Sequence, residues 1–386
     1  MSENSYNYIK HSKKIFFKSE IYPEYVTFFI TTRCNFACDH CFYWKELNTE
    51  KNELKLEEIQ KISNTMDEFN VIILTGGEPY LRADIAEIIK IFHKTNHIQN
   101  VITPTNGYFT DLMIKNISDV CESCPDLHYL VEVSIDDIGE KHNVIRRHEK
   151  AFEKAMITID KLKELKKKYS NLSLGIICVF SQLNQHRIKD IYYYIRDVIK
   201  PDSITIPLIR GNPKENVKNI DIAKYDEITE IIKKDFRSGH LGFNFRYSNV
   251  SKATTLLVRD LISNTYKTNS CQLTCHAGKI SCVIYPNGDV MTCEMLNKKL
   301  GNLRAVNYDF GKIWFSEETN KVTDWIKDTK CFCTHECNMT SNVLFSAKQW
   351  TKIPIEVMKM KLGQKDVEEK TNTVQNPPES TQPIAT

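Results

Sequence analysis

Three closely spaced cysteines, Cys34, Cys38 and Cys41, carry the clearest chemical signal in the sequence. Their spacing, C-x3-C-x2-C, places three thiols in one short loop directly after an apolar run. Three thiolates can hold three irons of a cubane [4Fe–4S] cluster, so that the fourth iron is left with an open position for chemistry. The alternative is a zinc site with His40 as fourth ligand, although zinc sites often draw on two C-x2-C pairs. The spacing therefore favours a cluster.

A second group of cysteines lies toward the C-terminus, where seven of the 13 cysteines fall within residues 271–337. Asn287-Gly288 between two alternating apolar runs predicts a β-hairpin, which would bring Cys275 and Cys293 together at its base. The odd count and the lack of a secretion signal argue against a disulfide framework, so metal binding explains the group better. We expect no metal role for Cys121, Cys124 and Cys178. Cys271 and Cys282 are possible extra ligands, although an incidental position is the favoured interpretation.

The elements that must position these residues alternate between strand and helix. The predicted strands are 25–31, 71–75, 101–105, 129–135, 172–180 and 203–208. The predicted helices are 54–69, 85–92, 112–120, 151–165 and 188–198. Continuous β-branched and aromatic runs indicate strands covered on both faces, and the alternation indicates parallel βαβ units. The expected fold is α/β, a partial (βα)6 TIM-like barrel with a small cysteine-rich C-terminal domain; periodicity alone also allows a doubly wound sheet.

Polar motifs follow three further predicted strands. Thr75-Gly76-Gly77-Glu78-Pro79 follows the second strand, Thr105-Asn106-Gly107 the third, and Ser134-Ile135-Asp136 ends the fourth. Glycines allow close backbone approach, and a carboxylate suits an ammonium group. Taken singly, such motifs are also explained as turns or caps. Because ligands bind at the carboxyl ends of parallel strands, their shared position predicts one binding edge, which Asn184 and residues 207–211 could extend.

Together these motifs resemble those of the radical SAM superfamily, over residues 25–210. The resemblance implies that the open iron binds S-adenosylmethionine (SAM), whose reductive cleavage gives a 5′-deoxyadenosyl radical that abstracts hydrogen from a substrate. The residues that it implies as SAM contacts are Phe42, Gly76, Gly77, Glu78, Asn106, Ser134, Asp136 and Arg146. It assigns Cys34, Cys38 and Cys41 to the cluster and leaves the catalytic acid or base unknown.

The C-terminal cysteines resemble the SPASM and twitch auxiliary-cluster domains, with Gly301-Asn302-Leu303 and Ile313-Trp314 similar to the connecting segment. The cysteines that this resemblance implies as ligands are Cys275, Cys293, Cys331, Cys333 and Cys337, one of which can be a non-ligand. We expect one auxiliary [4Fe–4S] cluster, with two as the alternative, because the C-x-C-x3-C ending is more compact than in a full SPASM domain. A structural zinc site is the other reading.

Composition and charge limit the possible partners and location of the protein. The net charge is +3 with 26% charged residues, which gives no indication of nucleic-acid or membrane partners. No apolar run suits a signal peptide or membrane helix, so a cytoplasmic protein is expected. The predicted units are an extension (1–23), the radical SAM core (24–210), a partly helical connector (211–268), the auxiliary domain (269–350) and a C-terminal segment (351–386), disordered from about residue 363.

These expectations leave the reaction open. We expect an oxidation, cross-link or epimerisation of a peptide or a small aminosugar-like molecule, with an electron donor such as flavodoxin or ferredoxin. The N-terminal segment is too short for a separate leader-peptide-binding domain, so the sequence slightly disfavours leader-guided peptide substrates. The alternatives are a non-catalytic iron–sulfur or zinc protein on a degenerate barrel and a sulfur-inserting enzyme.

Overall fold

Six parallel strands form the barrel wall in sequence order. The computed structural model describes residues 21–49, 52–240 and 248–362. The strands are β1 (Tyr25–Thr31), β2 (Val71–Gly76), β3 (Asn100–Thr105), β4 (His128–Ser134), β5 (Leu172–Ile177) and β6 (Ser203–Thr205). In β1, Val26, Phe28 and Ile30 lie in the main core, whereas Phe29 faces the inner side. Strand β1 is thus buried on both faces, as the sequence predicted.

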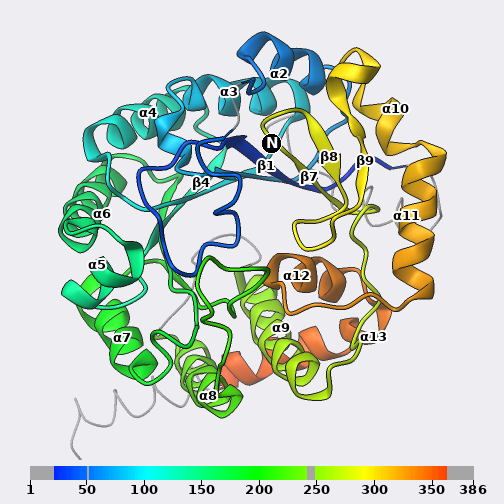
Figure 1. Cartoon of the computed structure of the whole chain (residues 1–386). Helices are drawn as coiled ribbons and strands as arrows, with labels where there is room; N and C mark the ends of the chain where they lie inside the picture. The colour runs from blue at the N-terminus through cyan, green and yellow to red at the C-terminus, as the bar shows by residue number, and fades with distance from the viewer. Residues whose placement is uncertain (1–20, 50–51, 241–247, 363–386) are drawn as a thin grey trace, which may run out of the picture.

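Helices cover the outer face of this curved sheet (Figure 1). They are α2 (Leu56–Ser63), α3 (Ile85–Asn96), α4 (Thr110–Ser123), α5 (Glu140–Arg146), α6 (Ala151–Lys168), α7 (Ile188–Tyr194) and α8 (Ile222–Ser238), with short turns η1 (Pro79–Leu81) and η2 (Ile195–Ile199). The right-handed strand–helix–strand units place every strand's carboxyl end at one rim. The partial α/β barrel is confirmed, and this rim is where the motifs meet.

The predicted hairpin extends the barrel sheet. Strands β7 (Ser281–Ile284), β8 (Asp289–Met291) and β9 (Lys299–Asn302) follow β1 in a nine-stranded sheet of order β6-β5-β4-β3-β2-β1-β7-β8-β9. Strand β7 runs parallel to β1, with Tyr25 beside Ser281 and Phe28 beside Ile284, whereas β8 and β9 are antiparallel. The backbone of the cysteine-rich segment is therefore hydrogen-bonded to the strand that leads into the Cys34 loop.

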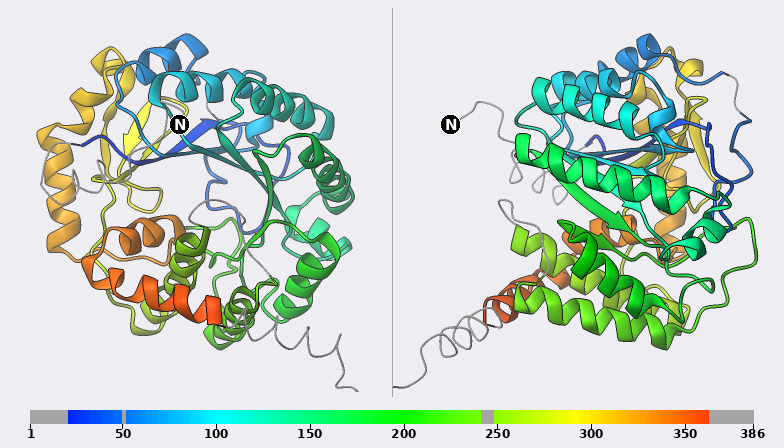
Figure 2. Two further views of the ribbon diagram at one scale, coloured as in Figure 1. Left: turned by 180° about the vertical axis from the view of Figure 1, so that it is seen from behind. Right: turned by 90° about the vertical axis from the view of Figure 1, so that its left-hand side faces the viewer.

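The remaining helices lie beyond the two ends of this sheet (Figures 1 and 2). They are α9 (Ser248–Thr268), α10 (Phe310–Trp314), α11 (Glu317–Asp328), α12 (Glu336–Leu344) and α13 (Ala347–Trp350), with the turn η3 (Leu303–Val306) before α10. Helix α9 packs against α8 and α12. These C-terminal helices lie opposite the strands, on the open side of the barrel (Figure 1).

Some predicted features differ from the structure or fall outside it. Helix α2 is shorter than the predicted 54–69. The connector contains α8 and α9, as expected of a partly helical segment. Most of the predicted N-terminal extension and the whole tail from residue 363 lie outside the described residues. Among the described residues, no helix is long and apolar enough to span a bilayer.

Candidate active site

The carboxyl ends of the barrel strands surround a cavity of about 210 Å³. Ten predicted site residues lie in its wall: Cys34, Cys38, Cys41, Phe42, Gly76, Gly77, Glu78, Asn106, Ser134 and Arg146. Asp136 is buried beside Arg146 and is not part of the wall, and none of the five predicted auxiliary cysteines lines it. The structure therefore gathers motifs from four separate strand ends around one space.

The cysteine loop (residues 32–49) contains no regular helix or strand and is held by polar contacts. Asn48 binds the backbone of Cys34 in both directions: its Oδ1 accepts from the Cys34 N–H at 3.1 Å, and its Nδ2 donates to the Cys34 carbonyl at 3.2 Å. Asn48 has a φ of 61°, a left-handed conformation that asparagine adopts more readily than most residues. The position of the first cysteine is thus fixed from the far end of its own loop.

The three thiols of this loop suit a metal cluster. Burial raises the pKa of Cys34 to about 12 and that of Cys41 to about 11, and it also raises the pKa of Cys38. Iron binds the thiolate, so these groups ionise only when a metal supplies positive charge. Soft thiol donors from one loop fit an iron–sulfur cluster. Among the described residues, no set of three or more His, Cys, Asp or Glu side chains is already placed to hold a metal ion.

Glu78 presents a buried carboxylate to the cavity. Only 1% of the residue is exposed, and its oxygens accept hydrogen bonds from Thr105 Oγ1 (2.8 Å), the Asn106 N–H (2.8 Å) and the Tyr80 N–H (3.2 Å). Burial raises its pKa to about 7, against the effect of these hydrogen bonds. All three hydrogen-bond partners are neutral, and the Arg146 guanidinium, which also lowers this pKa, does not offset the effect of burial. The ammonium group of SAM fits a buried carboxylate of this kind.

The two glycines before Glu78 allow its loop to pack directly on the cysteine loop. A Cβ on Gly77 would lie 2.1 Å from the Arg33 carbonyl oxygen, and a Cβ on Gly76 would lie 2.1 Å from that of Thr31. In their place, the Gly77 N–H donates to the Thr31 carbonyl at 2.9 Å. The Glu78 N–H likewise donates to the Arg33 carbonyl at 2.7 Å. The carboxylate and the cysteines are therefore joined through backbone alone.

Gly77→Ala is expected to destabilise the protein by about 3 kcal/mol, because the methyl group meets backbone that must move. Gly301→Ala is a matched control, since its Cβ would meet only side-chain atoms of Ile313 at 3.0–3.2 Å, and should cost about 1 kcal/mol. Urea unfolding of both variants measures the difference. Equal losses would contradict the close packing of the two loops.

Asp136 and Arg146, both predicted SAM contacts, pair with each other. The Arg146 Nη2 lies 2.6 Å from Asp136 Oδ2, and its Nη1 lies 3.8 Å from Cys38 Sγ. His40 Nε2 and the Val179 N–H also approach the Asp136 carboxylate, at 3.6 and 2.9 Å. Burial opposes ionisation, but the Arg146 guanidinium holds the pKa of Asp136 below its usual value. In the described part of the chain, Arg146 Nε has no hydrogen-bond partner, a buried donor that a ligand carboxylate could use.

A second buried carboxylate, Glu294, lies where the cavity approaches the C-terminal cysteines. It directly follows Cys293, and its Oε2 lies 3.0 Å from Arg210 Nη2 and 2.8 Å from His335 Nε2. Burial opposes ionisation, but Arg210 and His335 lower the pKa of Glu294 to about 2. The Arg210 guanidinium also lies over the Phe42 ring at 4.9 Å from its centroid. These contacts join the barrel rim, the cysteine loop and the C-terminal segment.

Sequence analysis did not single out Glu294 or His335. The available signal for Glu294 was its place directly after Cys293, a predicted ligand. Arg210 lay within the segment that was named as a possible extension of the binding edge, and it does line the cavity. Asn184, the other possible extension, instead donates its Nδ2 to two loop carbonyls at 2.9 Å and holds the loop after β5.

Most of the C-terminal thiols interact with one another. Burial raises the pKa of Cys333 to about 12. The thiols that raise it further belong to Cys275, Cys293 and Cys331. Cys271, which the sequence offered as a possible extra ligand, acts in the same way on Cys275 and Cys331. These thiols therefore lie near one another in the segment where the sequence predicts an auxiliary metal centre.

The Cys337 thiol has different electrostatic neighbours from the other C-terminal thiols. The charged and polar groups that act on it belong to Arg210, Glu294, Tyr25 and Glu336. Cys337 also lines a small cavity with Tyr25 and Cys293. Of the five predicted auxiliary ligands, Cys337 is thus the one that the structure places among other partners.

Comparison with known families agrees with this geometry. The family model for the radical SAM superfamily matches residues 28–195, which include the cysteine loop and the motifs at the ends of β2, β3 and β4. The model for SPASM, an iron–sulfur cluster-binding domain, matches residues 275–338. The chain belongs to the radical SAM superfamily. Its cofactors are a [4Fe–4S] cluster and SAM, and its SPASM domain holds auxiliary iron–sulfur clusters.

Curated relatives match this radical SAM protein over part of their length. It is 28% identical over 178 residues to a GTP 3′,8-cyclase of Vibrio parahaemolyticus, covering 45% of this chain and 51% of the relative. It is 26% identical over 216 residues to a GTP 3′,8-cyclase of Aquifex aeolicus, covering 54% and 63%. The chain thus spans between about half and two thirds of the length of these two relatives.

Solved structures share the fold of this radical SAM protein at low sequence identity. The anSMEcpe structure with bound AdoMet superposes with a TM-score of 0.56 at 18% identity, covering 91% of this chain and all of that one. Streptococcus suis SuiB bound to S-adenosylmethionine gives a TM-score of 0.57 at 14% identity, covering 82% and 71%. These superpositions extend beyond the barrel into the SPASM domain and confirm the overall architecture.

Proposed function

We propose that this radical SAM protein is an oxidoreductase of the SPASM type that abstracts hydrogen from a peptide. The proposal includes Cys34, Cys38 and Cys41 as cluster ligands, with reduced flavodoxin or ferredoxin as electron donor. In support, anSMEcpe was solved with the Cp18Cys peptide and SuiB with its precursor peptide SuiA. The observation that carries the proposal is the position of Glu294. This residue lines the cavity at the strand ends, called the SAM cavity from here on, and directly follows Cys293 of the SPASM domain.

A second cavity supports a substrate larger than a single sugar. It measures about 500 Å³ and shares Phe42, Tyr43 and Glu294 with the SAM cavity, so the two spaces adjoin. Its wall combines apolar side chains and the amides Asn212, Asn287 and Asn297 with charged side chains, and this mixture suits the side chains and backbone of a peptide. The charged members are Lys45, Glu46, Asp289 and Glu294, and the apolar members are Phe42, Tyr43, Tyr285, Pro286, Met291, Met295 and Leu296.

The residues of the chain would divide the work between binding and orientation. When bound, SAM and its cluster supply hydrogen-atom abstraction from the substrate. Glu78 would hold the ammonium of SAM, and Arg146 Nε would face its carboxylate. Glu294, ionised beside Arg210, would accept a hydrogen bond from the substrate group that enters the shared wall. The apolar lining would exclude water from the reacting carbon.

Deuterium transfer tests both the reaction and the substrate class. Anaerobically reconstituted protein would be incubated with SAM, dithionite and one of three perdeuterated mixtures: tryptic peptides of bacterial protein, aminosugars, or GTP. Hydrogen abstraction from a substrate carries deuterium into 5′-deoxyadenosine, which mass spectrometry detects. We expect deuterium transfer only from the peptide mixture.

Each of the other outcomes would change either the substrate class or the assignment as an enzyme. Deuterium transfer from the aminosugars or from GTP would replace the peptide by that class while retaining the radical chemistry. Formation of 5′-deoxyadenosine without deuterium from any mixture would reject all three classes. A reconstituted protein that binds iron but forms no 5′-deoxyadenosine would instead be a non-catalytic cluster protein.

A further inference from the structure

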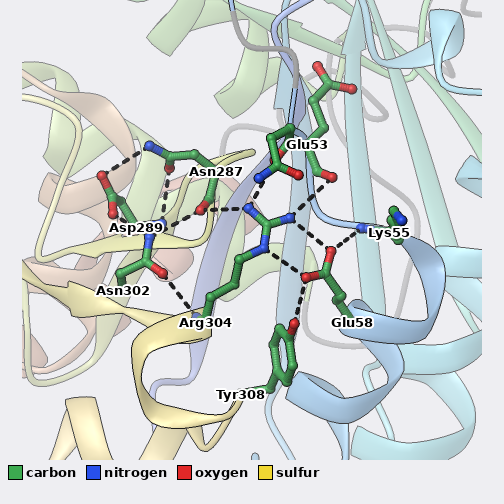
Figure 3. Close-up of polar contacts among 9 residues, drawn as sticks. Glu53, Lys55, Glu58, Asn287, Asp289, Asn302, Arg304 and Tyr308 are labelled. Atoms are coloured by element: carbon green, nitrogen blue, oxygen red, sulfur yellow. Dashed lines mark hydrogen bonds and ion pairs between the residues drawn. The ribbon is translucent and has the colours of Figure 1, made fainter.

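Arg304, in the turn after β9, uses every hydrogen-bond donor of its guanidinium group (Figure 3). Nε donates to Glu58 Oε1 at 2.7 Å, and Nη2 donates to Glu58 Oε2 at 2.8 Å and to the Glu53 carbonyl at 3.3 Å. Nη1 donates to the carbonyls of Asn52 at 2.9 Å and Asn287 at 3.3 Å. A guanidinium has five N–H donors, so none is left over.

The acceptors come from three separate parts of the chain. Glu58 belongs to α2, Asn287 to the hairpin turn of the SPASM domain, and Asn52 and Glu53 to the segment between the cysteine loop and α2. The hydrogen bond from Arg304 is the largest cause that lowers the pKa of Glu58, to about 2. Arg304 therefore ties the auxiliary domain to the chain that follows the cysteine loop.

Glu53 carries this connection to the start of the cysteine loop. Its Oε1 accepts hydrogen bonds from Thr31 Oγ1 at 2.8 Å and from the Thr32 N–H at 2.7 Å, at the end of β1. A further hydrogen bond, from the Leu54 N–H to the Pro286 carbonyl at 2.7 Å, fixes the segment around Glu53 to the SPASM hairpin. Glu53, which follows the cysteine loop in the chain, thus holds the start of that loop, and Arg304 binds the backbone carbonyl of Glu53 from the SPASM side.

We propose that Arg304 is a positioning residue for the radical SAM cluster: it fixes Glu53, and through Glu53 the backbone that leads into Cys34. The proposal rests on the proposed role of Cys34, Cys38 and Cys41 as ligands. The auxiliary domain then does more than hold its own clusters, because its Asn287 turn and Arg304 set the geometry of the SAM site. Arg304 touches neither cofactor, so its effect passes through the loop.

Lysine cannot replace arginine in this role. An ammonium offers three donors from one point, whereas the five acceptors lie around a flat fork on three segments. Arg304→Lys retains the charge, and hence the attraction to Glu58, but releases carbonyls of residues 52 and 53. The variant should therefore fold and bind iron while its cysteine loop is held less rigidly.

The test compares Arg304→Lys with a matched variant, Arg196→Lys. Arg196 is also a partly exposed arginine (23% against 24%) that bridges two carboxylates, Asp197 and Asp235, far along the sequence from the cysteine loop. Full-length proteins would be reconstituted anaerobically, and iron, sulfide and the urea midpoint measured. The decisive readout is the change that SAM produces in the electron paramagnetic resonance spectrum of the reduced protein, together with SAM affinity.

For Arg304→Lys we expect unchanged iron content, a weakened SAM-induced spectral change and about tenfold weaker SAM binding, as loss of charge-assisted hydrogen bonds would give. Arg196→Lys should stay within about twofold of the unchanged protein. Glu53→Ala, which leaves the guanidinium contacts with Glu58 intact, should reproduce the Arg304→Lys spectrum.

Three results would overturn the inference: a normal SAM-induced spectrum in Arg304→Lys, an equal loss in Arg196→Lys, or a normal spectrum in Glu53→Ala. Failure of the underlying assignment looks different. If Cys34, Cys38 and Cys41 do not hold the SAM cluster, their replacement leaves the SAM-induced spectrum intact, whatever Arg304→Lys does.

Discussion

Replacing Cys34, Cys38 and Cys41 together with alanine is expected to reduce 5′-deoxyadenosine formation by about 10³-fold or more, since enzymatic rate enhancements are commonly ~10⁶-fold or larger. The three thiols belong to one loop and line the same cavity as Glu78. Removing them takes away the three predicted ligands of the cluster, so about four irons per chain should be lost. Anaerobic reconstitution with iron and chromatographic assay of 5′-deoxyadenosine measure both effects.

The matched control is the double variant Cys121→Ala, Cys124→Ala. These cysteines form a C-x2-C pair at the end of α4, both are buried, and neither lines the cavity. Their replacement should leave iron content and SAM cleavage unchanged, although small cavities will cost some stability. Substantial SAM cleavage by the triple variant, or an equal loss in the control, would contradict the assignment of the first three cysteines.

The barrel was predictable because its signals are local. Each strand is a short β-branched or aromatic run, and each binding motif follows a strand within a few residues, so strand order and rim could be predicted together. The run 25–31 coincides with β1. The same local reasoning found the hairpin turn at Asn287-Gly288. Contacts between neighbours in sequence were enough for these features.

Features decided by distant parts of the chain could not be predicted in this way. Helix α2 was expected to begin at Leu54, but the Leu54 N–H bonds to Pro286 and the helix begins at Leu56. The helix ends at Ser63, six residues before the expected Phe69, and the Asn96 side chain binds carbonyls in this stretch. Apolar periodicity contains no information about such partners.

In the candidate site, too, residues with local sequence signals were predicted, whereas pairings between distant segments were not. Glu78 and the cysteines were found from motifs, whereas the pairing of Asp136 with Arg146 and of Glu294 with Arg210 depends on how loops meet in space. Arg304 gave no signal in the sequence because its acceptors are mostly backbone carbonyls. Residue type predicts a ligand site better than it predicts the residues that hold that site in place.

Glu78→Gln is expected to weaken SAM binding on the order of 100-fold, because the buried carboxylate would lose its pairing with the SAM ammonium. The SAM-free variant should be at least as stable as the unchanged protein at pH 8, since a neutral amide replaces a buried charge whose hydrogen-bond partners are all neutral. Thermal unfolding with and without SAM, and calorimetric titration under anaerobic conditions, measure both effects. An exposed-site control is Glu149→Gln, which should change neither.

Both the stability of the SAM-free protein and its affinity for SAM should depend on pH through Glu78. The pKa of Glu78 is raised to about 7 by burial, so the folded SAM-free protein keeps a proton that the unfolded chain has already lost. The stability contributed by protonated Glu78 should therefore be lost as pH rises from about 4.5 through 7, so the fall over this range should be smaller in Glu78→Gln, where Glu132, whose pKa burial also raises to about 7, still titrates. Because the SAM ammonium needs the ionised carboxylate, SAM affinity should rise with pH and level off above about 7, with proton release on binding below it. A SAM affinity that is equal at pH 6 and pH 8, or a Glu78→Gln variant that binds SAM normally, would separate this carboxylate from the ammonium.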